Sequence, residues 1–149
     1  MYLTYGDLAE LFPKASGIKD NELHFHTVAA SSSIVQPKGI YIPLEEKENL
    51  KEAIGNGAVA ALWNKKDQLP AYTPNHFPIF YMNDLRKGLK DIMELYIEKM
   101  KRADKKINTT NFLFLDEKSL KENDATYDIA VMAEKLHAAY GQNKQERRG

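Results

Sequence analysis

The chain has 149 residues, of which 43% are hydrophobic and 10% aromatic, as is typical of one folded domain with or without an appendage. Basic and acidic residues number 21 each, and this zero net charge argues against a dominant polyanion-binding role. The absence of cysteine excludes disulfides, thiolate catalysis and thiolate metal sites. No segment resembles a secretory signal or approaches the roughly 18 apolar residues of a membrane span. We therefore expect a cytoplasmic protein without a nucleic-acid or membrane partner.

The first expected element is a short helix that begins after Thr4. Thr4 is a typical N-cap, and Asp7 stands three residues later, which is the spacing of a capping box. Leu3 and Leu8 occupy the two positions of a hydrophobic staple. Pro13 is expected to end the helix, because proline cannot continue the backbone hydrogen-bond ladder.

The middle of the chain alternates strand-like and helix-like segments. The expected elements are, in order, strands over residues 22–28 and 40–44, a helix over 45–57, and strands over 58–63 and 78–82. The run AVAALW over residues 58–63 is too short for a helix and is typical of a strand covered on both faces. Pro43 lacks an amide hydrogen, so its strand either lies at a sheet edge or ends there.

The longest expected helix follows Asn83, which we expect to be its N-cap. Apolar residues recur along it at three- and four-residue steps: Leu85, Leu89, Ile92, Met93, Tyr96 and Met100. Further strand and helix patterns cover residues 112–115 and 126–140, and the polar residues 142–149 are expected to form a disordered tail.

These patterns predict an α/β fold with a small mixed five-stranded sheet flanked by helices. We expect an α/β domain over residues 1–104. A C-terminal strand and helix extension over residues 105–141 is expected to pack on this domain, ahead of the tail at 142–149.

Three motifs follow one another between Ala30 and about Arg102: SSSIVQPKGIYIPL, EAIGNGAVAAL and PIFYMNDLRKGLKDIMELY. Their order and spacing resemble the N-terminal domain of the Mur ligase family, whose members use ATP to add amino acids to UDP-N-acetylmuramic acid during peptidoglycan synthesis. The similarity is greatest to the members that add the third residue or the terminal dipeptide, and it covers about half of the chain. It implies an α/β module that holds the UDP end of the nucleotide sugar.

The chain departs from the family pattern in three places. Ser31, Ser32 and Ser33 stand where the family has Asp-Ser-Arg, so the serine is kept and both charges are lost. The family's Asp-Gly-His loop is missing, because Leu44 runs almost directly into the next expected helix. The sequence also contains no glycine-rich loop with Lys-Ser/Thr to cradle ATP phosphates. We therefore expect no catalytic residues, no cofactor and no ligase reaction from this polypeptide alone.

The three serines are the candidate substrate-binding residues. The hydroxyls of Ser31, Ser32 and Ser33 either donate to pyrophosphate or uracil oxygens or bond their own backbone, which is the commoner use of loop serines. Without an arginine there is no bidentate, charge-assisted grip on phosphate, so we expect a lower affinity than the family's.

Two other polar pairs favour structural interpretations. His24 and His26 share one face of a strand, but no third ligand stands at a diagnostic spacing, so no metal site is expected. Asn83 and Asp84 open a helix directly after a strand. Asp84 would repel phosphate there, which favours a helix cap over an anion site.

A basic cluster and a tryptophan are also expected to be structural. The cluster comprises Lys99, Lys101, Arg102, Lys105 and Lys106. It lacks interleaved aromatic residues and predicts a solvated helix end, where cations favour the helix dipole. Trp63 closes a buried strand and is expected to be a core residue rather than a stacking platform.

These observations favour a non-catalytic, stand-alone relative of the Mur ligase first domain. We expect an interaction or regulatory module linked to cell-wall precursor metabolism, with a protein partner or as a homodimer. The alternatives are a module that binds a UDP-sugar weakly and a ligase subunit that needs a separate ATPase partner. The first is favoured because the losses lie at the ligand-binding end.

Overall fold

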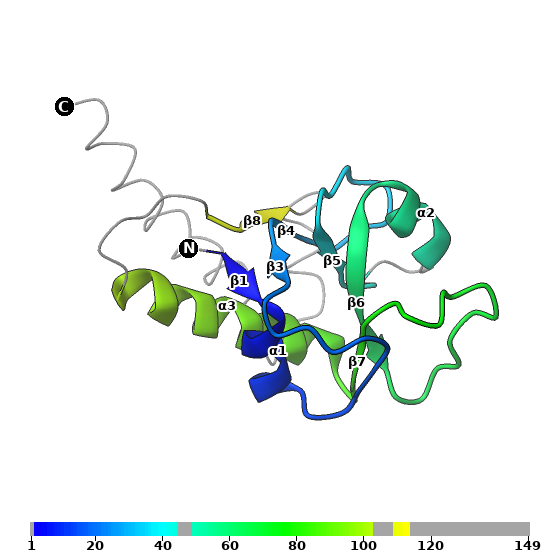
Figure 1. The fold of residues 1–149 in the computed structure, drawn as a ribbon, viewed down its shortest axis with the longest axis horizontal. Coiled ribbons are helices and arrows are strands. Elements are labelled where there is room, and N and C mark those ends of the chain that lie inside the picture. The colour runs from blue at the N-terminus through cyan, green and yellow to red at the C-terminus, as the bar shows by residue number, and fades with distance from the viewer. Residues whose placement is uncertain (1, 45–48, 103–108, 114–149) are drawn as a thin grey trace.

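The computed structural model describes residues 2–44, 49–102 and 109–113. These residues form an α/β fold with a mixed six-stranded sheet, a separate two-stranded sheet and three helices (Figure 1). The main sheet comprises β2 (Ala15–Ser16), β4 (Thr27–Ala29), β5 (Gly39–Tyr41), β6 (Ala58–Asn64), β7 (Ile79–Met82) and β8 (Asn111–Leu113). The small sheet comprises β1 (Leu3–Thr4) and β3 (His24–Phe25), and the helices are α1 (Tyr5–Leu11), α2 (Leu50–Gly55) and α3 (Leu85–Arg102).

The main sheet has the strand order β2-β7-β6-β5-β4-β8. All neighbouring strands from β7 to β8 run parallel, and only β2 runs antiparallel to its neighbour β7. The expected mixed α/β sheet is therefore confirmed, with six strands rather than five. Because the parallel strands share one direction, their carboxyl ends meet along a single edge, where α/β proteins commonly place ligands.

Helices cover both faces of the main sheet, with α1 and α3 on one side and α2 on the other (Figure 1). Successive strand residues point to opposite faces, so β5, β6 and β7 each contribute to two cores. The larger core includes Val28, Ile40, Leu62, Phe80, Met93 and Tyr96. The smaller core under α2 includes Tyr41, Leu50, Ala53, Trp63 and Ile79. The near-continuous apolar runs of the sequence are explained by this double coverage.

The start of α1 follows the sequence prediction. The Thr4 hydroxyl accepts from the Asp7 amide at 3.2 Å, and the Asp7 carboxylate accepts from the Thr4 amide at 3.0 Å, which completes the capping box. Leu3 and Leu8 are fully buried in the same core, as a hydrophobic staple requires. The helix ends at Leu11, two residues before Pro13, so this boundary is confirmed.

The start of α3 differs from the prediction by one residue. Asp84, and not Asn83, caps the helix, because its Oδ1 accepts from the amides of Arg86 and Lys87 at 3.1 Å each. The apolar stripe itself is confirmed, since most of its members are fully buried: Leu89, Ile92, Met93, Tyr96 and Met100. This stripe holds α3 against the sheet.

The strand predicted over residues 22–28 is wrong as a single element. It divides into β3 and β4, which belong to different sheets on either side of His26. The two-residue strands β1 and β2 were not predicted, because such short segments show no alternation. The strand predicted over residues 40–44 is β5, which ends at Tyr41 and lies inside the sheet. Pro43 therefore follows the strand's end and does not mark a sheet edge.

The helix predicted over residues 45–57 is shorter in the structure. It is α2, whose N-cap Asn49 accepts from the Glu52 amide at 3.1 Å. Residues 45–48, 114–115, 126–140 and 142–149 of the predicted elements lie outside the described residues. Within the described part, none of the helices has both the length and the apolar character that a bilayer crossing requires.

Candidate functional site

The three candidate serines follow β4 and form a compact turn. Ser31 and Ser32 are buried, with 1% and 3% of their surfaces exposed, whereas Ser33 is exposed. The Ser31 and Ser33 hydroxyls lie 3.0 Å apart in a shared hydrogen bond, and the Ser33 amide donates to the Ser31 hydroxyl at 3.3 Å. The structure thus brings the three serines together and engages Ser31 and Ser33 with each other.

The middle serine is bonded to α2. The Ser32 hydroxyl donates to Oε1 of Glu52 at 2.7 Å, and the Ser32 carbonyl accepts from the Asn56 side-chain amide at 2.8 Å. The two partners, Glu52 and Asn56, lie 20 and 24 residues after Ser32 in the sequence. The pattern around the serines therefore did not reveal them.

A buried glutamine, Gln36, forms hydrogen bonds to the backbone of the same turn. Gln36 is fully buried, and its Nε2 donates to the carbonyls of Ser31 and Ile34 at 3.0 Å each. Its backbone amide donates to the Asn56 carbonyl at 2.8 Å. The turn and α2 are therefore one hydrogen-bonded unit. Substrate binding by the three serines stays a prediction, and their hydroxyls bond within the turn and to α2.

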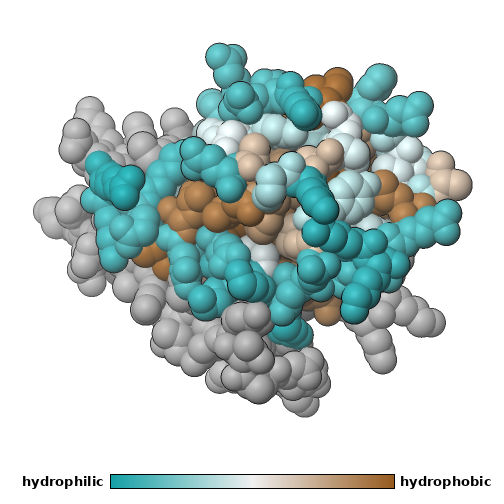
Figure 2. All heavy atoms as spheres, turned by 90° about the horizontal axis from the view of Figure 1, so that it is seen from below, coloured by the Kyte–Doolittle hydropathy of each residue, from teal (hydrophilic) through white to brown (hydrophobic). Residues whose placement is uncertain are grey.

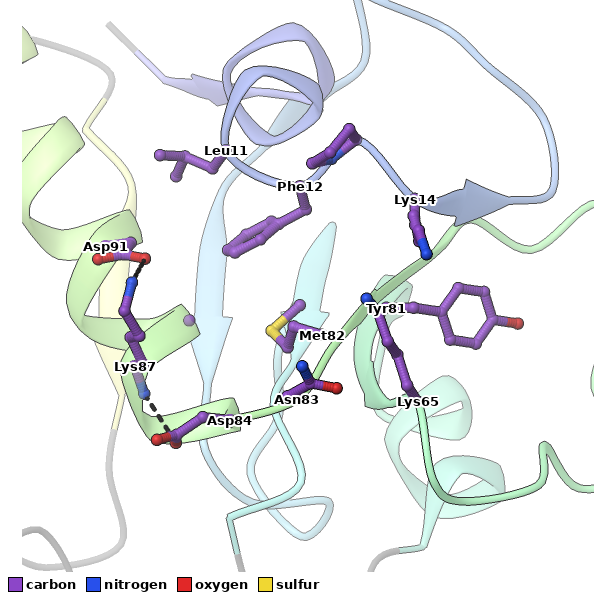
Figure 3. A pocket seen from close by; sticks show the side chains of 12 residues that line it. Leu11, Phe12, Lys14, Lys65, Tyr81, Met82, Asn83, Asp84, Lys87 and Asp91 are labelled. Atoms are coloured by element: carbon purple, nitrogen blue, oxygen red, sulfur yellow. Dashed lines mark hydrogen bonds and ion pairs between the residues drawn. The ribbon is translucent and has the colours of Figure 1, made fainter.

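A cleft of about 330 Å³ lies at the carboxyl ends of β6 and β7, beside the first turns of α3 (Figure 3). Its lining comprises Leu11, Phe12, Pro13, Lys14, Lys65, Tyr81, Met82, Asn83, Asp84, Lys87, Gly88 and Asp91. The sequence pattern did not reveal this cleft, because its walls come from three stretches of the chain, residues 11–14, 65 and 81–91. In the sheet it lies two strands away from β4 and the serine turn.

Gly88 brings α3 close to the apolar wall of the cleft. A Cβ atom at this position would overlap Sδ of Met82 and lie 3.6 Å from the Phe12 ring. Phe12 and Met82 are both buried, with 6% and 9% of their surfaces exposed. The absence of a side chain at Gly88 thus lets the helix pack directly against these two residues.

Two lysines of the cleft are positioned by backbone bonds on either side of β7. The Lys14 carbonyl accepts from the Tyr81 amide at 2.9 Å, and the Lys65 amide donates to the Met82 carbonyl at 2.9 Å. Both side chains are exposed, and Figure 3 shows their amines directed toward the cavity. Neither amine forms an ion pair with any residue in the described ranges.

The other charged groups of the cleft already have partners. The Lys87 amine contacts the Asp91 carboxylate at 3.1 Å, and Asp84 caps α3 (Figure 3). The Tyr81 ring points away from the cavity, and its hydroxyl lies 3.1 Å from that of Ser16. The cleft therefore offers the positive charges of Lys14 and Lys65 beside the apolar surface of Phe12 and Met82.

A second hollow, of about 440 Å³, lies along α1 and α3. It is lined by Asp7, Glu10, Leu95, Glu98, Lys99 and Arg102. Figure 2 views the molecule from below the orientation of Figure 1, and on this face apolar surface forms a strip bordered by hydrophilic side chains. The Lys99 amine lies 2.7 Å from the Asp7 carboxylate, so these two charges of the lining compensate each other.

The histidine pair lies against an aromatic ring. The His26 ring stacks on Tyr2 with centroids 4.1 Å apart and planes 13° apart, and the His24 centroid lies 5.9 Å from the same ring. Burial, and then the charges of Lys38 and His24, lower the pKa of His26. No group of three or more His, Asp or Glu side chains suited to a metal ion occurs among the described residues.

Trp63 is a core residue, as expected, with 2% of its surface exposed. The expectation of a solvated basic helix end is wrong for Lys99, which forms the ion pair with Asp7 and also donates to the Tyr2 carbonyl at 3.0 Å. It holds for Lys101, whose side chain is 68% exposed. Lys105 and Lys106 lie outside the described residues.

Comparison with known proteins finds no matching protein-family model and no significant match to a curated protein. The chain is therefore placed in no family on this basis.

Proposed function

We propose that the chain is a non-catalytic relative of the Mur ligase first domain that acts as an interaction or regulatory module in cell-wall precursor metabolism. The α/β architecture supports the proposal, with a mixed sheet and a serine turn directly after one of its parallel strands. The missing glycine-rich loop supports the non-catalytic part, because without it nothing cradles the phosphates of ATP.

The observation that carries the proposal is the hydrogen bond of 2.7 Å from Ser32 to Glu52. A serine hydroxyl has a single proton to donate, and here that proton serves a carboxylate of the same chain. An incoming pyrophosphate would have to displace the carboxylate and would meet its negative charge at contact distance. The retained serine of the motif is thus used for internal structure, which favours a partner-binding role over a nucleotide-sugar site.

Titration with UDP-N-acetylmuramic acid tests this choice. We expect the ¹⁵N-labelled full chain to show no saturable shifts at the amides of Ser31, Ser32 and Ser33 up to millimolar ligand. Saturable binding that Ser32→Ala weakens would overturn the proposal and establish the alternative, a weak UDP-sugar module. Ser16→Ala is the control, because Ser16 is also exposed but lies in β2, at the far edge of the main sheet from the serine turn.

The exposed position of Glu52 gives that alternative a specific test of its own. Glu52→Ala removes the carboxylate that competes for the Ser32 hydroxyl. Binding that appears only in Glu52→Ala would show a site closed by its own helix, which agrees with the proposed loss of function. Lys51→Ala on the same helix is the control for general effects on α2.

The interaction role is tested by purification of the tagged full chain from its native host at low and high salt. We expect a stoichiometric protein partner, or a homodimer by sedimentation. A monomer at all concentrations without a stoichiometric partner would contradict the module role. Co-purification of an ATPase subunit with ligase activity would instead establish the chain as part of an enzyme.

A further inference from the structure

The cleft at the carboxyl ends of β6 and β7 combines three features of a ligand site. It is concave, it lies at the edge of a parallel sheet where ligands commonly bind, and it has polar and apolar walls. Its volume of about 330 Å³ lies at the small end of the range for small-molecule pockets, which begins near ~300 Å³. This is enough room for one ring with one polar substituent.

The charge of the cleft selects for an anion. The Lys14 and Lys65 amines point into it, and neither has an ion-pair partner in the part of the chain that the structure describes. Backbone bonds to both sides of β7 fix the backbones of the two lysines relative to each other. Two cations on one ligand favour a dianion such as a phosphate monoester over a monoanionic carboxylate.

The backbone amides at the start of α3 do not contribute to the attraction of an anion. Asp84 already accepts from the amides of Arg86 and Lys87, so these donors are occupied. Its carboxylate adds negative charge at that rim of the cleft. An anion would therefore lie at the opposite wall, near Lys14 and Lys65.

The apolar wall selects for the rest of the ligand. Phe12 and Met82 face the cavity from α1's end and from β7, and Gly88 keeps α3 packed against them. Aromatic and thioether side chains make favourable contacts with a flat ring. A ring against this wall would leave its charged substituent within reach of the amines.

We infer that this cleft binds a small aromatic phosphate monoester, with the phosphate between the Lys14 and Lys65 amines and the ring against Phe12 and Met82. This site goes beyond the proposed interaction role and uses none of the residues of the serine turn. The two proposals therefore stand or fall separately.

Phenyl phosphate is the probe, with inorganic phosphate and phenol as the two halves of the ligand. In NMR titrations of the ¹⁵N-labelled full chain at low salt, we expect phenyl phosphate to shift the amides of Lys65, Asn83 and Gly88 saturably. It should bind about tenfold or more tightly than either half, because both walls contribute. Added salt should weaken the binding, since the attraction is between exposed charges.

Lys14→Gln and Lys65→Gln should each weaken phenyl phosphate binding several-fold, because each removes one of two cations from the site. Lys51→Gln is the matched control, since Lys51 is equally exposed but lies on α2 across the sheet. Far-ultraviolet circular dichroism of each variant checks that the fold is kept.

Four results would overturn the inference. Inorganic phosphate that binds as tightly as phenyl phosphate would show that the apolar wall is not used. Phenol that binds as tightly would show the same for the lysines. Equal weakening by Lys51→Gln would show non-specific attraction to surface charge, and an absence of saturable shifts at millimolar probe would show that the cleft is not a site.

Discussion

The hydroxyl of Thr110 donates a hydrogen bond of 2.6 Å to the backbone carbonyl of Phe25. The same oxygen accepts from the Leu3 amide at 2.9 Å, and the Thr110 amide donates to the Tyr96 hydroxyl at 2.8 Å. Thr110 is fully buried. One residue at the entrance to β8 therefore joins both strands of the small sheet to α3.

Thr110→Val should destabilise the protein by about 2–4 kcal/mol, because it keeps the side-chain shape but leaves two buried backbone groups without this partner. Urea unfolding of the full chain, followed by circular dichroism, measures the loss. Thr73→Val is the control, since its hydroxyl donates to the Pro70 carbonyl at 2.7 Å in a half-buried loop. Equal losses in the two variants would contradict the junction role of Thr110.

Gly88→Ala should destabilise the protein by about 1–3 kcal/mol, although alanine is the better helix former, because the new methyl group overpacks the core. It would overlap Sδ of Met82 and lie 3.2 Å from Cδ1 of Leu62. Gly55→Ala in α2 is a matched control, because nothing lies within 4 Å of its added Cβ. Thermal unfolding compares the two variants. A stability gain in both would show that α3 can move away from the sheet.

Lys99→Met should cost about 1–2 kcal/mol, because the lysine bridges α1 and α3 in a partly buried, hydrogen-bonded ion pair. Its side chain is 23% exposed and that of Asp7 is 21% exposed. Lys101→Met should cost less than about 0.5 kcal/mol, since its pair with Glu98 is an exposed one within a single helix. Urea unfolding in low and high salt separates the two. A larger effect for Lys101→Met would contradict the bridge.

Acidification should destabilise the fold through His26. Burial and nearby Lys38 and His24 lower its pKa in the folded state, so the unfolded chain binds the proton more readily. This contribution is fully present above the ordinary histidine pKa of about 6.5 and is lost as the pH falls through the lowered value. His26→Gln should flatten the pH dependence of unfolding between about 7.5 and 5.5. An NMR midpoint for His26 at or above the ordinary value would contradict this account.

Local patterns predicted the elements that depend on neighbouring residues. The capping box is formed by Thr4 and Asp7, which are three residues apart, and the buried strand by the continuous run 58–63. Both can therefore be recognised from neighbouring residues in the sequence. The pairing of Leu3 with Phe25 depends on a distant segment, and it divides the predicted strand at His26. Two-residue strands gain their stability from such pairing and leave no periodic pattern.

The candidate sites show the same limit. The serine motif was recognisable, but the carboxylate of Glu52 that bonds to Ser32 comes from another element. Lys14 and Lys65 were not identified, because only the position of β7 between β2 and β6 brings them together. The spacing of Lys14 and Lys65 in the sequence does not indicate that they lie close together in the fold.

The outer edge of β4 is completed by β8, whose residues are made long after those of β4. While the chain is being synthesised, β4 can pair with β5 on one side, but its other side has no native strand until Leu113 has emerged. At typical bacterial to eukaryotic elongation rates this interval lasts roughly 4–17 s. During that time an unpaired row of backbone donors and acceptors is open to other nascent chains. Because β8 is synthesised after β4, a delay in synthesis would prolong the exposure of this edge of β4 and favour aggregation there.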